Sequence, residues 1–194
     1  DVDDVVIEIK PMTWHHVNLW HTQVQPLINL HYRHWTPGAH ARDVRADVQW
    51  DWARIYSLAL LHNTSRYLPT NRSGPARAFA MVVFTEDGFE IPIGMLTVVP
   101  EFNCSVEGVT RTRTFAWYLA DSPKSFYTDV LRVDQVVGVA AALVDTAIQS
   151  GLDAGGDGRV VVHRGPGVPG QLRRGSGRAP GPQRLDVRRV QPAP

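Results

Sequence analysis

Two β-rich runs joined by a short turn signal constrain the fold of this chain more than any other feature. Residues 77–99 read "RAFAMVVFTEDGFEIPIGMLTVV", and Asp87-Gly88 lies between the two runs. Asp-Gly between apolar, β-branched runs is a strong signal for a β-hairpin. Pro92 lacks a backbone N–H, so we expect a bulge or an unpaired position there. A third run at 112–120 extends the prediction to an antiparallel meander.

A strand pattern and two helical patterns precede the meander. The apolar and β-branched residues of 5–10 predict a first strand, and Thr13 is placed to cap a helix over residues 13–35. Pro26 cannot donate its backbone hydrogen bond, so this helix should bend or restart near that residue. The apolar spacing predicts a second helix over about residues 43–61.

A third helical pattern follows the meander in residues 133–151, "VDQVVGVAAALVDTAIQSG". Apolar residues recur there at three- and four-residue steps, and Gly151 is placed as a C-cap glycine. The opening turn has the pattern Gln135-x-x-Gly138-x-Ala140, and the first turn of a helix offers free backbone N–H groups to an anion. A plain amphipathic helix, in which Gly138 serves only close packing, is the alternative.

The order of elements is therefore strand, two helices, three strands, helix and strand, with the last strand at 159–163. This order predicts an α+β or mixed α/β fold in which helices flank a mostly antiparallel central sheet. We assign the domain to residues 1–163. Residues 164–194 are rich in Arg, Gly, Pro and Ala and have almost no apolar periodicity, so we treat them as an atypical tail.

The charge of the chain is distributed unevenly. Residues 1–163 contain 13 Lys and Arg against 18 Asp and Glu, whereas residues 164–194 contain seven Arg and one Asp. An acidic body is a poor match for nucleic acid and a better match for a cationic substrate, although a merely solvated acidic surface is the alternative. No apolar run reaches the roughly 18 residues of a membrane span. The lone Cys104 and the absence of a signal-peptide pattern lead us to expect a cytoplasmic protein.

The order of elements and two short motifs resemble the GNAT superfamily of acyl-CoA-dependent N-acetyltransferases. The motifs are Pro11-Met12-Thr13 after the first strand and Gln135-x-x-Gly138-x-Ala140 after the meander. The resemblance implies that the second motif binds the diphosphate of acetyl-CoA and that the pantetheine chain pairs with the fourth strand, through either residues 119–121 or residues 131–133. The cofactor-binding residues that it implies are Tyr118, Leu119, Ala120, Val133, Gln135, Val136, Val137, Gly138, Val139 and Ala140.

Acetyl transfer to an amine needs a group that accepts the amine proton and a group that protonates the leaving thiolate. The family resemblance implies Asp121 or Glu107 as the base, although each also has the simpler interpretation of a solvated surface carboxylate. Family members often use a tyrosine beyond the fifth strand as the acid, but no tyrosine follows Tyr127. The resemblance also places three residues at the acceptor pocket: Tyr32, His34 and Trp35.

A metal site is not expected. His31 and His34 are three residues apart and could share a helical face, but no carboxylate or cysteine joins them locally. Ordinary amphipathic packing explains these histidines without a metal.

We therefore expect an enzyme that transfers an acetyl group from acetyl-CoA to a small-molecule or peptide amine, with a homodimer as one candidate state. The alternative is a catalytically silent acyl-CoA-binding or protein-interaction module on the same fold, which the missing tyrosine and the tail would fit. The composition after His163 also suggests a hypothesis that residues 164–194 are read out of frame. Resequencing the gene across His163 tests that hypothesis.

Overall fold

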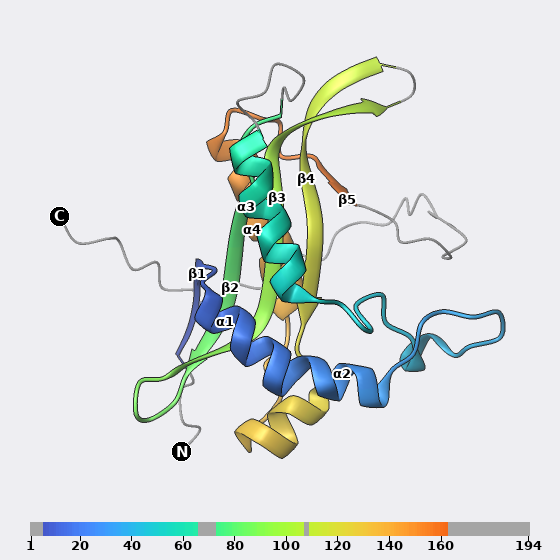
Figure 1. Cartoon of the computed structure of the whole chain (residues 1–194), viewed down its shortest axis with the longest axis vertical. Helices are drawn as coiled ribbons and strands as arrows, with labels where there is room; N and C mark the ends of the chain where they lie inside the picture. Colours follow the sequence, from blue (N-terminus) through green and yellow to red (C-terminus); the bar gives the residue numbers. More distant parts are fainter. Residues whose placement is uncertain (1–5, 66–72, 107–108, 163–194) are drawn as a thin grey trace, which may run out of the picture.

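A five-stranded sheet in the order β1-β2-β3-β4-β5 forms the centre of the structure (Figure 1). The structure is a computed structural model that describes residues 6–65, 73–106 and 109–162. Neighbouring strands pair antiparallel except for β5, which pairs parallel with β4. The strands are β1 (Ile7–Pro11), β2 (Arg77–Phe84), β3 (Glu90–Val106), β4 (Val109–Asp121) and β5 (Val160–Val162). The predicted fold class, with a mostly antiparallel sheet flanked by helices, is confirmed.

Helices cover the sheet, with α3 in front of it and α4 behind it in Figure 1. The α-helices are α1 (Trp14–Leu19), α2 (Gln25–His31), α3 (Trp52–Ser65) and α4 (Val139–Asp153). Two π-helical segments, η1 (Trp20–Val24) and η3 (Phe126–Leu131), and the short 3₁₀ turn η2 (Ala41–Asp43) complete the described elements. The main core is apolar and contains residues of the sheet and of the helical segments, among them Trp20, Trp52, Met95, Leu96 and Leu143.

The first helical segment begins as the sequence predicts. Thr13 caps α1 with a reciprocal pair of hydrogen bonds: its hydroxyl accepts from the His16 amide, and the His16 ring accepts from the Thr13 amide. The predicted restart near Pro26 is also confirmed, because the π-helical turn η1 gives way to α2 just before that proline. The segment ends at His31, four residues before the predicted end, since Tyr32 is extended.

The prediction of a helix over residues 43–61 is wrong in its first half. Helix α3 begins only at Trp52. Before it, Val44 forms an isolated parallel bridge with Arg33, and the Arg45 amide donates to the Arg33 carbonyl. Gln49 then has a φ of 60°, in the left-handed region, which an α-helix does not contain. These tertiary bonds hold residues 44 and 45 beside Arg33, and residues 46–49 then form a turn.

The predicted hairpin and the irregularity at Pro92 are confirmed. The turn lies at Glu86 and Asp87, and Gly88 has a φ of +79°. Met81 pairs with Gly94, but Val82 pairs with Pro92, so one residue of β3 is extra in the ladder. A β-bulge accommodates the missing N–H of the proline.

A second bulge lies in β4. Thr97 pairs with Tyr118, but Val98 pairs with Ala116, so Trp117 is the extra residue. On the other side of β4, strand β5 pairs only with residues 114–116. Among the described residues, no strand therefore covers the edge of β4 from residue 117 to residue 121.

Helix α4 begins later than the sequence predicts. Its first residue is Val139, not Val133, because the preceding Gly138 has a φ of +83°. Residues 133–137 are therefore a loop that leads into the helix. The alternative, a plain amphipathic helix that includes Gly138, is likewise wrong about where the helix begins, while its claim that no ligand binds at this turn stays a prediction.

The predicted C-cap at Gly151 is also wrong. Gly151 lies inside α4, and a Cβ placed on it would come 1.9 Å from the Oγ1 of Thr114 on β4. Because Gly151 has no side chain, helix α4 can approach strand β4 closely at this position. The helix ends instead at Asp153, and Gly155 follows the C-cap Ala154 with a φ of +83°. The Gly155 amide donates to the Leu152 carbonyl, and the Gly156 amide donates to the Gly151 carbonyl. These two bonds are a Schellman motif.

Candidate functional site

The first turn of α4 lies at the end of β4. Val139 and Leu143 pack on Gly94, where a Cβ would come 2.7 Å from Val139 Cγ1 and 2.9 Å from Leu143 Cδ1. Gly94 pairs with Asp121, the last residue of β4. The start of the helix and the uncovered end of β4 are therefore neighbours.

This helix start has free backbone donors. The first helical hydrogen bond runs from the Ala142 amide to the Gly138 carbonyl, at 2.9 Å, and no side chain caps the turn. The amides of residues 139–141 thus have no partner four residues back in the helix. The left-handed Gly138 ends the preceding loop, in which Gln135 and Val137 are exposed and Val136 is half-buried. The predicted residues 135–140 therefore form the loop and first turn of α4, next to the end of β4.

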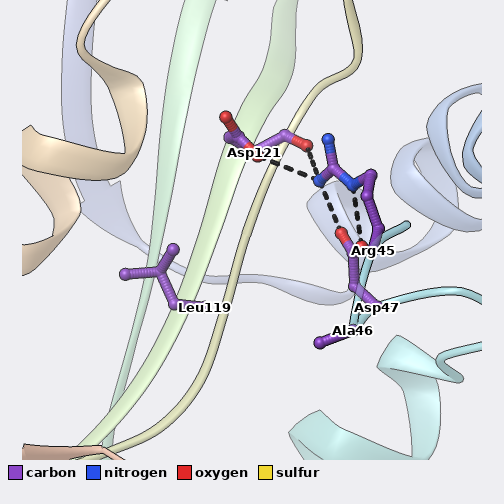
Figure 2. Close-up of a pocket in the computed structure, with 5 residues that line it drawn as sticks. All are labelled: Arg45, Ala46, Asp47, Leu119 and Asp121. Carbon is purple, nitrogen blue, oxygen red and sulfur yellow. Dashed lines mark hydrogen bonds and ion pairs between the residues drawn. The ribbon is translucent and has the colours of Figure 1, made fainter. Parts of the chain in front are cut away.

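A pocket of about 280 Å³ lies beside the end of β4 (Figure 2). It is lined by Leu119 and Asp121 of β4 and by Arg45, Ala46 and Asp47 of the segment before α3. Of the predicted catalytic residues, Asp121 thus lies in a pocket, and its side chain is 41% exposed. Glu107 lies outside the described residues.

Arg45 joins the two walls of this pocket. Its Nε and Nη2 donate to the two carboxylate oxygens of Asp47, at 2.8 and 2.6 Å, and Nη2 also donates to the carbonyl and Oδ1 of Asp121, at 2.6 and 2.9 Å. Burial alone would lower the pKa of Arg45, but the hydrogen bonds and charge of Asp47, with the charge of Asp121, raise it above its ordinary value. The cluster of these three residues therefore holds one cation between two anions.

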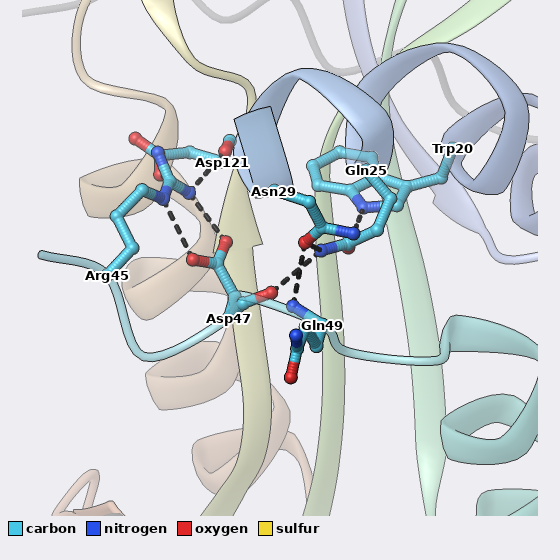
Figure 3. Close-up of polar contacts among 7 residues, drawn as sticks. All are labelled: Trp20, Gln25, Asn29, Arg45, Asp47, Gln49 and Asp121. Atoms are coloured by element: carbon cyan, nitrogen blue, oxygen red, sulfur yellow. Dashed lines mark hydrogen bonds and ion pairs between the residues drawn. The ribbon is translucent and has the colours of Figure 1, made fainter. Parts of the chain in front are cut away.

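A chain of amide side chains anchors Asp47 in turn (Figure 3). Gln25 is buried; its Nε2 donates to the Asp47 carbonyl, at 2.8 Å, and to Asn29 Oδ1, at 3.0 Å, while its Oε1 accepts from the Trp20 ring. Asn29 Oδ1 also accepts from the Gln49 amide, at 2.7 Å. The pocket wall is thus tied to the core of η1 and α2.

One aromatic ring contacts Arg45 of the cluster, and an aromatic pair includes Tyr118, the residue before Leu119 of the pocket. The guanidinium of Arg45 lies 5.3 Å from the ring centroid of Tyr32, and Tyr118 meets Trp50 edge to face at 5.1 Å. Of the three predicted acceptor residues, Tyr32 therefore contacts the cluster. His34 and Trp35 are exposed and do not line the pocket.

Tyr127 is buried close to this region. Its hydroxyl has no hydrogen-bond partner among the described residues. Burial, and then the charge of Asp121, raise the pKa of Tyr127 above its ordinary value. The phenol is therefore protonated at neutral pH, but Tyr127 does not line the pocket.

A second pocket, of about 500 Å³, lies between the end of α3 and Trp117. It is lined by Leu58, Leu61, His62, Thr64, Ser65 and Trp117. The His62 Nε2 is already engaged with the Gly74 carbonyl, at 2.9 Å. With no carboxylate in its lining, this pocket offers less to an amine than the pocket at Asp121.

Sequence reasoning missed Arg45, Asp47 and Gln25. A helix over residues 43–61 would place Arg45 and Asp47 on different faces. In the structure the chain is extended at Val44 and turns over residues 46–49, and the Asp47 carboxylate accepts from Arg45. The partner Asp121 is 76 residues away from Arg45, and no local pattern connects them.

The solved structures that are similar to this chain include three of aminoglycoside acetyltransferases. The first is AAC(6')-Iy in complex with CoA: 15% identity, 84% of this chain and 79% of that chain covered, and a TM-score of 0.46. The second is the same protein with the bisubstrate analogue CoA-S-monomethyl-acetylneamine: 16% identity, 82% and 80% covered, and a TM-score of 0.44.

The third structure is meta-AAC0020 from an uncultured soil metagenomic sample, in complex with trehalose. It shows 13% identity, 86% and 82% coverage, and a TM-score of 0.41. No family model matches the chain. No curated protein matches it either.

The described part of the chain contains no group of three or more His, Cys, Asp or Glu side chains that could hold a metal ion. Within the same residues, no helix has both the length and the apolar character needed to cross a membrane.

Proposed function

We propose that this chain is a GNAT-like N-acetyltransferase that binds acetyl-CoA along the end of β4 and the start of α4 and acetylates an amine in the Asp121 pocket. One observation carries the proposal: an uncapped helix start, entered through the left-handed Gly138, lies beside a strand edge that no described strand covers. The helix start offers donors to the diphosphate of CoA, and the strand edge offers backbone groups to the amides of its pantetheine chain.

The helix start suits the diphosphate. Free amides at the first turn and the positive end of the helix dipole both favour an anion. Gly138 has no side chain to obstruct the approach of the backbone, and Ala140 adds only a methyl group. Gln135, exposed in the loop, carries a further amide donor.

The edge of β4 suits the pantetheine chain. Its amides can pair with backbone groups of residues 118–120 as a further strand would. The alternative at residues 131–133 is less suitable, because the Val133 amide already donates to the Tyr127 carbonyl, at 3.1 Å. We therefore assign the pantetheine to β4.

The pocket suits the acceptor amine. Oδ2 of Asp121 accepts no hydrogen bond from the described residues, so it is free to bind an ammonium group and to direct its proton toward water. The neutral amine then attacks the thioester carbonyl: the new C–N bond forms, the C–S bond breaks, and the proton that the attacking nitrogen loses passes through water to the thiolate. Asp121 holds the nucleophile against the carbonyl for this step.

Isothermal titration with CoA and acetyl-CoA tests the proposal with a matched pair of glycine variants. Gly138→Glu adds bulk and negative charge at the proposed diphosphate site, and we expect at least about a tenfold loss of affinity, or about 1.4 kcal/mol. Gly155→Glu is the control: its φ is also +83°, it lies at the other end of the same helix, and nothing surrounds its Cβ within 4 Å. Both variants suffer the same backbone strain, so equal affinities in the two would remove the phosphate role from Gly138.

A silent acyl-CoA-binding module is the second candidate function. It is favoured by the lining of the Asp121 pocket, which contains no tyrosine or cysteine that could protonate the leaving thiolate. An acetylation screen over polyamines, aminoglycosides and peptide N-termini distinguishes the two. Tight binding of acetyl-CoA without turnover of any amine would favour the module.

A further inference from the structure

Among the described residues, Arg45 alone donates hydrogen bonds to both Asp47 and Asp121 at the candidate acceptor pocket. It is largely shielded, with a side chain 17% exposed, and its fork engages both oxygens of Asp47. Such a planar, bidentate contact fixes the direction of the guanidinium as well as its place.

The fixed guanidinium in turn restrains Asp121. Nη2 binds both the main-chain carbonyl and one carboxylate oxygen of this residue. The side chain of Asp121 is therefore held against its own strand, with one oxygen engaged and the other unengaged. A carboxylate at a strand end that is 41% exposed would otherwise sample several rotamers.

We propose that Arg45 is a positioning residue that orients the Asp121 carboxylate for the acceptor amine, with Asp47 and Gln25 as its support. This inference rests on the proposed function, since it assigns Asp121 to the acceptor. The support is continuous: the Trp20 ring binds Gln25, Gln25 binds the Asp47 carbonyl, and Asp47 binds Arg45 (Figure 3). Arg45 itself acts only through Asp121.

A double-mutant cycle on acetyl transfer tests this assignment. In the wild-type background, Arg45→Met should lower kcat for the amine about 10- to 100-fold, because a misplaced group near the reacting atoms costs this much. The dissociation constant of acetyl-CoA should not change. In the Asp121→Asn background, the same replacement should cost less than about threefold, because the group that Arg45 positions is already altered.

Arg42→Met is the matched control. This arginine lies three residues earlier, is 84% exposed at its side chain and contacts only Asp43 among the described residues. Its replacement should leave kcat unchanged. Equal losses from Arg45→Met in both backgrounds would overturn the proposal, because a general structural effect does not depend on Asp121.

Hydrogen exchange provides a readout that needs no acceptor. The amides of Arg45, Gln49 and Trp50 are bonded within the pocket wall and its surroundings. Arg45→Met and Asp121→Asn should each increase exchange at these amides, whereas Arg42→Met should not. Unchanged exchange in Arg45→Met and Asp121→Asn would overturn the proposal that the Arg45–Asp121 contact holds the two sides of the pocket together.

Two further outcomes are separable. If Arg45→Met does not fold, Arg45→Lys replaces it in the cycle: the charge stays but the bidentate fork is lost, so a kcat between those of wild type and Asp121→Asn supports the proposal, and wild-type kcat overturns it. If the wild-type protein binds no acetyl-CoA and acetylates no amine, the proposed function fails. The exchange experiment then still decides whether Arg45 restrains Asp121.

Discussion

Single buried polar groups in this chain differ in whether they have partners, and stability measurements can distinguish them. The hydroxyl of Tyr127 is buried without a partner among the described residues, whereas that of Tyr56 donates to the Met12 carbonyl, at 3.0 Å. We expect Tyr127→Phe to leave the free energy of unfolding unchanged or to raise it by up to about 1 kcal/mol. Tyr56→Phe should lower it by about 1 kcal/mol.

Chemical denaturation of the two tyrosine variants and the wild type checks this expectation. The pair is matched in chemistry, since each variant loses one oxygen. A loss of stability in Tyr127→Phe as large as that in Tyr56→Phe would show that the Tyr127 hydroxyl has a partner that the described contacts do not include.

Glu90 makes the stability of the fold depend on pH. It accepts hydrogen bonds from Lys10 and from His16, whose Nε2 lies 3.0 Å from Oε2. The bond from Lys10 and then that from His16 hold the pKa of Glu90 below its ordinary 4.5. A lowered pKa in the folded state stabilises the fold fully above pH 4.5, and this contribution is lost as the pH falls through the folded-state pKa.

Glu90→Gln should therefore lower the free energy of unfolding by about 0.5–1 kcal/mol near neutral pH, a modest value because the ion pairs are partly solvated. The difference from wild type should shrink as the pH falls below 4.5. Glu86→Gln is the control in the same hairpin: Glu86 is exposed and has no ion-pair partner among the described residues. Urea denaturation across the acidic range measures both, and a Glu90→Gln difference that persists at low pH would contradict the linkage.

At the scale of elements, the contact between α4 and β4 depends on the absence of a side chain at Gly151. In an unobstructed helix, Gly→Ala raises stability by up to about 1 kcal/mol through helix propensity. Here the added Cβ would come 1.9 Å from Thr114 Oγ1, so we expect Gly151→Ala to lower stability by about 1–3 kcal/mol instead. Chemical denaturation measures the change in the free energy of unfolding: a decrease shows that the steric contact with Thr114 dominates, and an increase shows that helix propensity dominates.

The double variant Gly151→Ala/Thr114→Ala sharpens the test. Removing the Thr114 hydroxyl and methyl relieves the closest contact, so the two changes together should cost less than the sum of the single changes. Strict additivity would show that the helix and the strand do not meet at this pair.

Elements with a local pattern could be predicted from the sequence. The Asp-Gly turn, the bulge at Pro92 and the cap at Thr13 each follow from a few adjacent residues, and all are confirmed. The segment before α3 could not be predicted, because the Arg33–Val44 bridge and the left-handed Gln49 override its helical spacing. The same difference applies to the site: the Gly138 motif is local, whereas the meeting of Arg45 with Asp121 depends on the whole fold.

At the scale of the whole molecule, the described residues form one sheet with helices on both faces, and both core clusters lie between Met12 and Ala147. The assignment of the domain to residues 1–163 stays a prediction. So does the hypothesis about the reading frame of residues 164–194, which lie outside the described residues. Both concern sequence beyond the last described strand.

The order of the sheet has a consequence for folding kinetics. Strands β2, β3 and β4 follow one another along the chain, so their pairing closes short loops, whereas β1 and β5 join the sheet only after the long helical crossovers that precede β2 and β5. Arg45 lies in the first crossover and Gly138 in the second. We therefore expect the meander, which includes Asp121, to form first, whereas Arg45 and Gly138 belong to segments that consolidate after it. A ligand bound across them would act mainly by slowing unfolding, with little effect on the rate at which the chain folds.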